Sequence, residues 1–108
     1  MVALILIVKF NQVMQKISQR IEQYSQEYEI NRDSDWHILK LQEEVGELAQ
    51  AYLRLSKRAR TKGLSQQEIK ESFAEELADV LGMAMLIADY HKIDLLEAVK
   101  NKWFKHIE

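Results

Sequence analysis

The sequence predicts an all-α fold, a bundle of four antiparallel helices in a single domain that spans residues 1–108. The chain contains no proline and only 3 glycines, whereas a fold of many strands needs frequent turns. Apolar residues recur at steps of three and four over long stretches, which is the period of a helix. Short polar segments separate these stretches, so consecutive helices are expected to lie side by side in opposite directions.

The first ten residues, 1–10, are almost wholly apolar. This run is too short to span a bilayer, which takes ~20 residues in a helix. No basic residue precedes it and no small-residue cleavage site follows it, so it does not resemble a signal peptide. Two interpretations stay open: a buried helix start or short strand, or an apolar contact between copies of the chain.

A first helix is predicted from Phe10 to about Ile30, because apolar residues line one face and Gln, Lys, Ser and Glu the other. The segment 31–35 contains several residues suited to cap a second helix, predicted from Trp36 to about Arg60. Basic residues close that stretch, and Gly63 follows as the expected stop signal.

A third helix is predicted to start at a capping box, in which Ser65 and Glu68 satisfy each other's backbone N–H groups. It runs to about residue 90. Asp94 and Glu97 have the same spacing and open a fourth helix that continues to the end of the chain. Four helices with short links predict a bundle.

The composition excludes several classes of protein. The chain has no cysteine, so disulfides and thiolate zinc sites are excluded. It has 15 basic and 17 acidic residues, so it lacks the basic excess typical of nucleic-acid-binding proteins. We therefore expect no nucleic-acid partner, no membrane partner and a cytoplasmic location.

The acidic residues contain one pattern twice, acid-acid-apolar-small-acid, at positions 43–47 and 75–79. On a helical wheel, Glu44 and Glu76 lie within the apolar stripes of their helices. Glu47 and Asp79 lie at the edges of these stripes. Glu43 and Glu75, the first acids of the two patterns, point outward. The two patterns fall on consecutive helices, so four carboxylates are expected to converge.

Converging carboxylates in an apolar stripe are costly unless a cation balances them. Lys40 is the best basic candidate on the same face, but one lysine does not balance four acids. Oxygen ligands favour a hard divalent cation such as Mg²⁺ or Mn²⁺. A di-iron site of the Glu-x-x-His type is not favoured, because no histidine has a glutamate three residues before it. The alternative is a solvated acidic face paired to lysines across the bundle.

This pattern resembles that of the MazG-like nucleotide pyrophosphohydrolases, which belong to the all-α nucleoside-triphosphate pyrophosphatases. The family pattern is Glu-Glu-x-x-Glu followed by Glu-x-x-Asp, and the match extends over residues 36–102. The resemblance implies hydrolysis of a nucleoside triphosphate to a monophosphate and pyrophosphate, as in sanitation of the nucleotide pool. It also implies assembly into a homodimer or homotetramer.

The resemblance also implies roles for individual residues. The residues that match the Mg²⁺ ligands are Glu44, Glu47, Glu76 and Asp79. Either Glu47 or Glu43 would accept the proton of the attacking water. Lys102 matches a lysine that meets phosphate, and Lys40 is a second candidate for that contact. Trp36 and His37 are candidates to stack on the base, with a core position as the alternative for Trp36. A non-catalytic helical interaction or metal-binding module is the competing function.

Overall fold

The computed structural model describes residues 2–107 and is all-helical over that range, which confirms the predicted all-α class. It has four α-helices and one short 3-10 helix: α1 (Val2–Glu27), α2 (Ser34–Leu55), α3 (Gln66–Tyr90), α4 (Leu95–Trp103) and η1 (Phe104–His106). Side chains are described from residue 4 onward.

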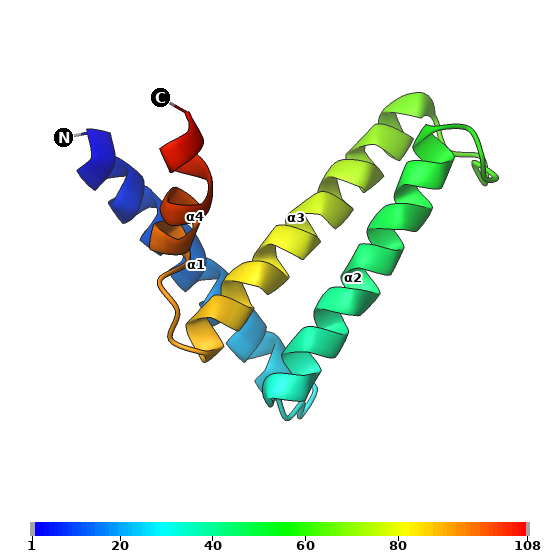
Figure 1. Cartoon of the computed structure of the whole chain (residues 1–108). Coiled ribbons are helices and arrows are strands. Elements are labelled where there is room, and N and C mark those ends of the chain that lie inside the picture. The colour runs from blue at the N-terminus through cyan, green and yellow to red at the C-terminus, as the bar shows by residue number, and fades with distance from the viewer. Residues whose placement is uncertain (1, 108) are drawn as a thin grey trace.

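Helices α2 and α3 form an antiparallel pair that makes the main helix contact of the molecule (Figure 1). Ala51 of α2 and Ile69 and Met83 of α3 are buried. Helix α1 packs across α3, and α4 follows α3 after a short turn. The α2–α3 pair carries both copies of the acidic pattern, so it is the part of the fold that positions the candidate site.

The apolar N-terminal segment is the beginning of α1 rather than a separate element. No glycine or proline interrupts residues 2–27, so the helix runs without a break. Its first turns are not buried in the single chain. Leu4 is 63% exposed, and Ile5, Leu6, Ile7 and Val8 are exposed as well. The first helix thus begins at Val2, so the predicted start at Phe10 was wrong because the apolar run continues the helix. The interpretation of residues 1–10 as a buried helix start does not hold for the exposed residues 4–8.

Helices α1, α2 and α3 all end in the same way. The second residue beyond each helix has a left-handed backbone: φ is 54° at Glu29, 64° at Lys57 and 57° at Lys92. The next N–H then bonds the carbonyl five residues earlier, each at 2.8 Å: Ile30 to Ser25, Arg58 to Leu53 and Ile93 to Ala88. Glycine usually occupies this left-handed position, but none of these three residues is a glycine.

The predicted end of the second helix was wrong for this reason. Helix α2 ends at Leu55 instead of near Arg60, because the chain turns at Lys57. Gly63 also has a left-handed backbone, with φ at 80°, but it lies in the loop that leads to α3 and does not terminate α2.

The helix starts follow the predicted caps more closely. Asp33 accepts a hydrogen bond from the N–H of Trp36 at 2.8 Å, so α2 begins two residues before the predicted start. The capping box of Ser65 and Glu68 is confirmed, with both bonds present. Asp94 accepts from the N–H of Glu97 at 3.0 Å, and α4 then gives way to η1 before the chain ends.

The described part of the chain is flat and open, with extents of 46 × 44 × 21 Å. Its radius of gyration is 16.5 Å, above the ~13 Å expected for a compact chain of this length. Apolar side chains are exposed along the α2–α3 pair: Ile38, Leu39, Val45, Leu53, Leu77 and Leu81. None of the described helices is both long enough and apolar enough to cross a membrane. A single copy therefore leaves much apolar surface exposed.

Candidate metal centre

Three carboxylates from α2 and α3 converge at the middle of the helix pair. Oxygen atoms of Glu44, Glu47 and Glu76 all lie within 4.8 Å of one another. Glu44 and Glu47 are three residues apart, which keeps both on one face of α2. Glu76 reaches the same place from the antiparallel helix α3. We call these three residues the carboxylate cluster.

The cluster is buried on one side and open on the other. Glu44 is only 8% exposed and Glu76 is half-buried, whereas Glu47 is exposed. The Oε2 atoms of Glu44 and Glu76 are both buried, and neither has a hydrogen-bond partner among the described residues. Buried polar atoms are rarely left unpaired, because losing water without a replacement is costly. A cation held between these oxygens would supply the missing partner.

The pKa values reflect this crowding of negative charge. Burial, together with the charges of Glu47 and Asp79, raises the pKa of Glu44 to about 7, although Lys40 opposes the shift. Burial also raises the pKa of Glu76, again helped by Glu47 and Asp79. Both carboxyl groups therefore hold their protons to a higher pH than usual when no cation is bound.

Lys40 is the nearest cation on α2. Its Nζ lies 3.6 Å from Oε1 of Glu44 and 3.4 Å from Oε1 of Glu43. Burial lowers the pKa of Lys40, but the two carboxylates outweigh that effect and raise it. Lys40 thus stays charged and offsets part of the cluster's charge, while Oε2 of Glu44 remains unpaired. The outward acid Glu43 is exposed and contacts Lys40, which matches its predicted place on the wheel.

Asp79 is the fourth predicted ligand, and the structure places it beside the cluster rather than within it. Its charge raises the pKa of both Glu44 and Glu76, so it lies close to them. It is exposed and is not one of the three carboxylates that meet within 4.8 Å. Asp79 instead shares a neighbouring cavity with Glu44.

That cavity lies between α1, α2 and α3 and has a volume of about 580 Å³. We call it the central cavity. Glu44 and Asp79 line it together with the cations Lys16, Arg20 and Lys40 and the aromatic residues Tyr24 and Trp36. Apolar side chains, among them Ile17 and Met83, complete its wall. Acidic, basic and aromatic groups thus face one space.

The contribution of α1 to this cavity was not predicted from the sequence. Lys16, Arg20 and Tyr24 are spaced by four residues and therefore share one face of α1. That spacing was visible in the sequence. What was not visible is that this face of α1 lies over the acidic helices, since only the packing of α1 across α3 brings them together.

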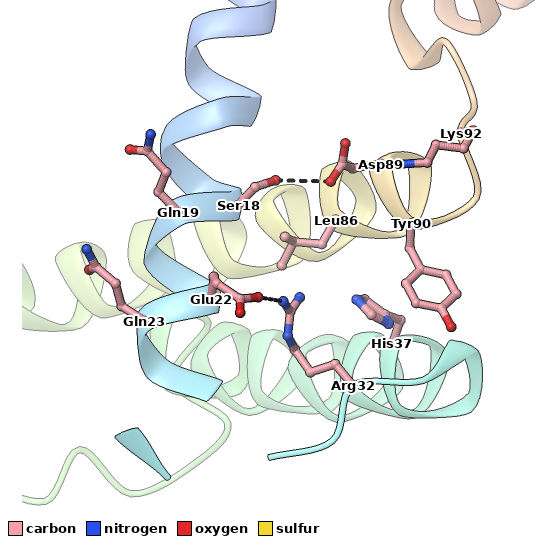
Figure 2. Close-up of a pocket in the computed structure, with 10 residues that line it drawn as sticks. All are labelled: Ser18, Gln19, Glu22, Gln23, Arg32, His37, Leu86, Asp89, Tyr90 and Lys92. Atoms are coloured by element: carbon pink, nitrogen blue, oxygen red, sulfur yellow. Dashed lines mark hydrogen bonds and ion pairs between the residues drawn. The ribbon is translucent and has the colours of Figure 1, made fainter. Parts of the chain in front are cut away.

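His37 lines a different cavity, shown in Figure 2, with a volume of about 720 Å³. Its side chain is 1% exposed, and Nδ1 donates to the carbonyl oxygen of Asp33 at 2.7 Å. Its ring lies 4.7 Å from the ring of Tyr90 and 5.1 Å from that of Trp36. Trp36 lines the central cavity and His37 this second one, so the two candidate base-stacking residues face different spaces.

Two polar contacts in the second cavity fix the position of α1 (Figure 2). Arg32, in the loop before α2, pairs with Glu22 of α1 at 2.6 Å. Ser18 of α1 donates to Asp89 near the end of α3 at 3.4 Å. Both contacts hold α1 against its neighbours, and so they help to keep Lys16 and Arg20 over the central cavity.

Lys102, the predicted phosphate contact, is exposed in the last turn of α4. Figure 1 shows α4 beside the N-terminal half of α1, away from the middle of the α2–α3 pair. Lys102 lines neither the central nor the second cavity, so the single chain does not bring it to the carboxylate cluster.

Comparison of the chain with known protein families, with curated proteins and with solved structures finds no match.

Proposed function

We propose that this protein is a Mg²⁺-dependent nucleoside triphosphate pyrophosphohydrolase, with Mn²⁺ as an alternative metal, acting on the nucleotide pool of the cytoplasm. One observation carries the proposal: Glu44 belongs to both the carboxylate cluster and the central cavity. A metal-binding group therefore adjoins a space lined by cations and aromatic rings. A nucleoside triphosphate with its metal needs this combination of groups.

The residues present fit a divalent metal. Glu44, Glu47 and Glu76 would hold it, because these side chains converge. Glu44 and Glu76 each also have a buried oxygen that lacks a hydrogen-bond partner among the described residues. Asp79 would complete the ligand set from the edge of the central cavity. Oxygen donors without histidine or cysteine favour Mg²⁺ or Mn²⁺. When bound, the metal would offset negative charge that develops on the phosphate oxygens.

The central cavity would receive the nucleotide. Its volume of about 580 Å³ is within the usual range for small-molecule sites, ~300–1,000 Å³. Lys40 beside Glu44 would contact the phosphates, and Lys16 and Arg20 of α1 would do so from the opposite wall. Trp36 and Tyr24 would provide a surface on which the base can stack.

The reaction adds water across one phosphoanhydride bond. A water oxygen attacks the α-phosphorus, the bond from that phosphorus to the bridging oxygen breaks, and pyrophosphate leaves. A carboxylate accepts the proton of the water. Glu47 is the better placed of the two candidate bases, because it belongs to the cluster and is exposed to solvent. Glu43 is already engaged with Lys40.

The proposal is tested with a panel of ribonucleotides and deoxyribonucleotides, with Mg²⁺, in water labelled with ¹⁸O. The expected products are a nucleoside monophosphate that carries the label and unlabelled pyrophosphate. Label in pyrophosphate, or release of single phosphate, would mean a different reaction. Metal binding without turnover of any nucleotide would favour the competing function, a non-catalytic helical interaction or metal-binding module.

The proposal includes assembly into a homodimer or homotetramer that completes a helical bundle. The exposed apolar residues of the α2–α3 pair support it, since a second copy packed there would cover Val45, Leu77 and Leu81. Light scattering should report at least twice the chain mass of 12.7 kDa. A species of 12.7 kDa at all concentrations would contradict this part of the proposal.

A further inference from the structure

The first turns of α1 and the C-terminal residues lie at the same end of the molecule (Figure 1). Ile7 of α1 and Leu96 of α4 line one cavity, which places the two segments side by side. Apolar side chains at this end are exposed, and we call them the terminal patch: Leu4, Ile5, Val8, Trp103, Phe104 and Ile107. Trp103 is 65% exposed and Ile107 is 74% exposed.

The same end is cationic. Lys9 follows the apolar run of α1, and Lys100, Lys102 and Lys105 flank the aromatic residues. The first acidic residue of the chain is Glu22, and residues 98–107 contain none, although Glu97 precedes and Glu108 follows this stretch. Asp94 and Glu97 line the cavity between α1 and α4, and Glu97 pairs with Lys100 at 3.6 Å. Lys9, Lys102 and Lys105 are the exposed cations of this end. The terminal patch is therefore apolar, and exposed lysines stand next to its residues in the sequence.

We infer that the terminal patch binds the surface of an anionic membrane, with its apolar side chains in the interface and its lysines on the lipid phosphates. Tryptophan and phenylalanine favour the boundary between headgroups and acyl chains, and lysines add attraction to anionic lipids. This binding is at the surface of the bilayer, since none of the described helices is long and apolar enough to cross it. This inference departs from the expectation of no membrane partner, which rested on the shortness of the apolar run.

A second copy of the chain fits this end less well than a membrane does. A symmetric contact would press the same surface against itself and bring the lysines of both copies together. Like charges facing each other across an interface oppose association. The exposed apolar face of the α2–α3 pair is the better contact between copies, and it leaves the terminal patch free. Positive charge beside apolar groups complements an anionic lipid surface.

The experiment is co-sedimentation of the full chain with vesicles of phosphatidylcholine alone or with about 30% phosphatidylserine. We expect binding to the anionic vesicles, little binding to the neutral ones, and weaker binding at high salt. The double variant K9E/K105E should lower the affinity at least about tenfold, given that each lysine near such a surface contributes ~1 kcal/mol. Trp103→Ala should weaken binding without changing its salt dependence.

The matched control is R58E/R60E, which changes the net charge by the same amount in the exposed loop between α2 and α3. This variant should retain binding to anionic vesicles, and circular dichroism should show that both variants stay helical. Equal loss of binding in the two variants would mean that only net charge matters and would overturn the inference. So would an absence of vesicle binding, or a loss of the oligomer in K9E/K105E, which would identify the patch as a contact between copies.

Discussion

Glu44 on α2 and Glu76 on α3 each direct one buried carboxylate oxygen, Oε2, to a place where no described residue donates a hydrogen bond to it. The two side chains occupy equivalent positions in the repeated acidic pattern. Their helices are antiparallel, so the repeat in sequence becomes a convergence in space (Figure 1). Such a pair is costly to bury unless protons or a cation neutralise the charge that Lys40 leaves unbalanced.

Mg²⁺ should stabilise the folded protein through the carboxylate cluster. A ligand present at 100 times its dissociation constant stabilises the fold by about 2.7 kcal/mol, which a thermal melt measures directly. Glu44→Gln and Glu76→Gln should each remove most of this gain, since each deletes a charged ligand. The matched control is Glu75→Gln, because Glu75 is the exposed neighbour of Glu76. Equal stabilisation of all three variants would show that the metal binds elsewhere.

Without metal, the free energy of unfolding should fall as the pH rises from about 4.5 to above 7. The pKa of Glu44 is about 7 when folded and 4.5 ordinarily, so the folded state binds more protons in this interval. Glu76 acts in the same direction. The loss assigned to Glu44 is at most about 3 kcal/mol, because one pKa unit corresponds to about 1.4 kcal/mol and the cluster opens to solvent.

Chemical denaturation at several pH values in a chelator measures this loss. Glu44→Gln cannot ionise, so its stability should change less with pH than that of the parent chain. Saturating Mg²⁺ should also flatten the profile by restoring stability above pH 7. A profile that is unchanged by Glu44→Gln would show that other groups govern the pH dependence.

The sequence predicted the helices better than it predicted their ends. Apolar periodicity and the caps at Ser65 and Asp94 located three of the four helix starts to within about two residues. Helices α1, α2 and α3 end two residues before a residue with a left-handed backbone, which is Glu29, Lys57 or Lys92. The predicted end of α3 near residue 90 is confirmed. The predicted end of α2 near Arg60 was wrong, because a lysine at the left-handed position carries no signal that the helix stops.

The candidate site was predictable to a similar extent. The helical wheel placed Glu44 in the apolar stripe, and Glu44 is buried as that position requires. The wheel could not show that Asp79 lies outside the group formed by Glu44, Glu47 and Glu76. That difference depends on how α2 and α3 pack against each other. The wheel also could not show that Lys16 and Arg20 face Glu44, since they lie on a helix that reaches the site only through packing.

Replacing Lys57 by glycine should stabilise the protein. Lys57 has φ at 64°, a region that costs a residue with a Cβ ~1–2 kcal/mol. Glycine removes that cost, but it also makes the unfolded chain more flexible, which favours unfolding. The expected net increase in the free energy of unfolding is about 0.5–1 kcal/mol, measured by urea denaturation. Lys57→Ala is the control: it removes the charge, keeps the Cβ and should give no increase. If alanine stabilises as much as glycine, the effect comes from charge and the strain at this position is negligible.

Arg20→Met should weaken nucleotide binding without slowing the chemical step. Arg20 lines the central cavity from α1, apart from the carboxylate cluster, so we expect it to bind the phosphates equally in the ground and transition states. A hydrogen bond to a charged group contributes about 1.5–3 kcal/mol, so KM should rise roughly tenfold or more while kcat stays within about twofold. Lys70→Met, which removes an exposed charge near the start of α3, should leave both constants unchanged. A fall in kcat with an unchanged KM would place Arg20 at the reacting phosphate instead, and unchanged kinetics would mean that the nucleotide does not enter the central cavity beside α1.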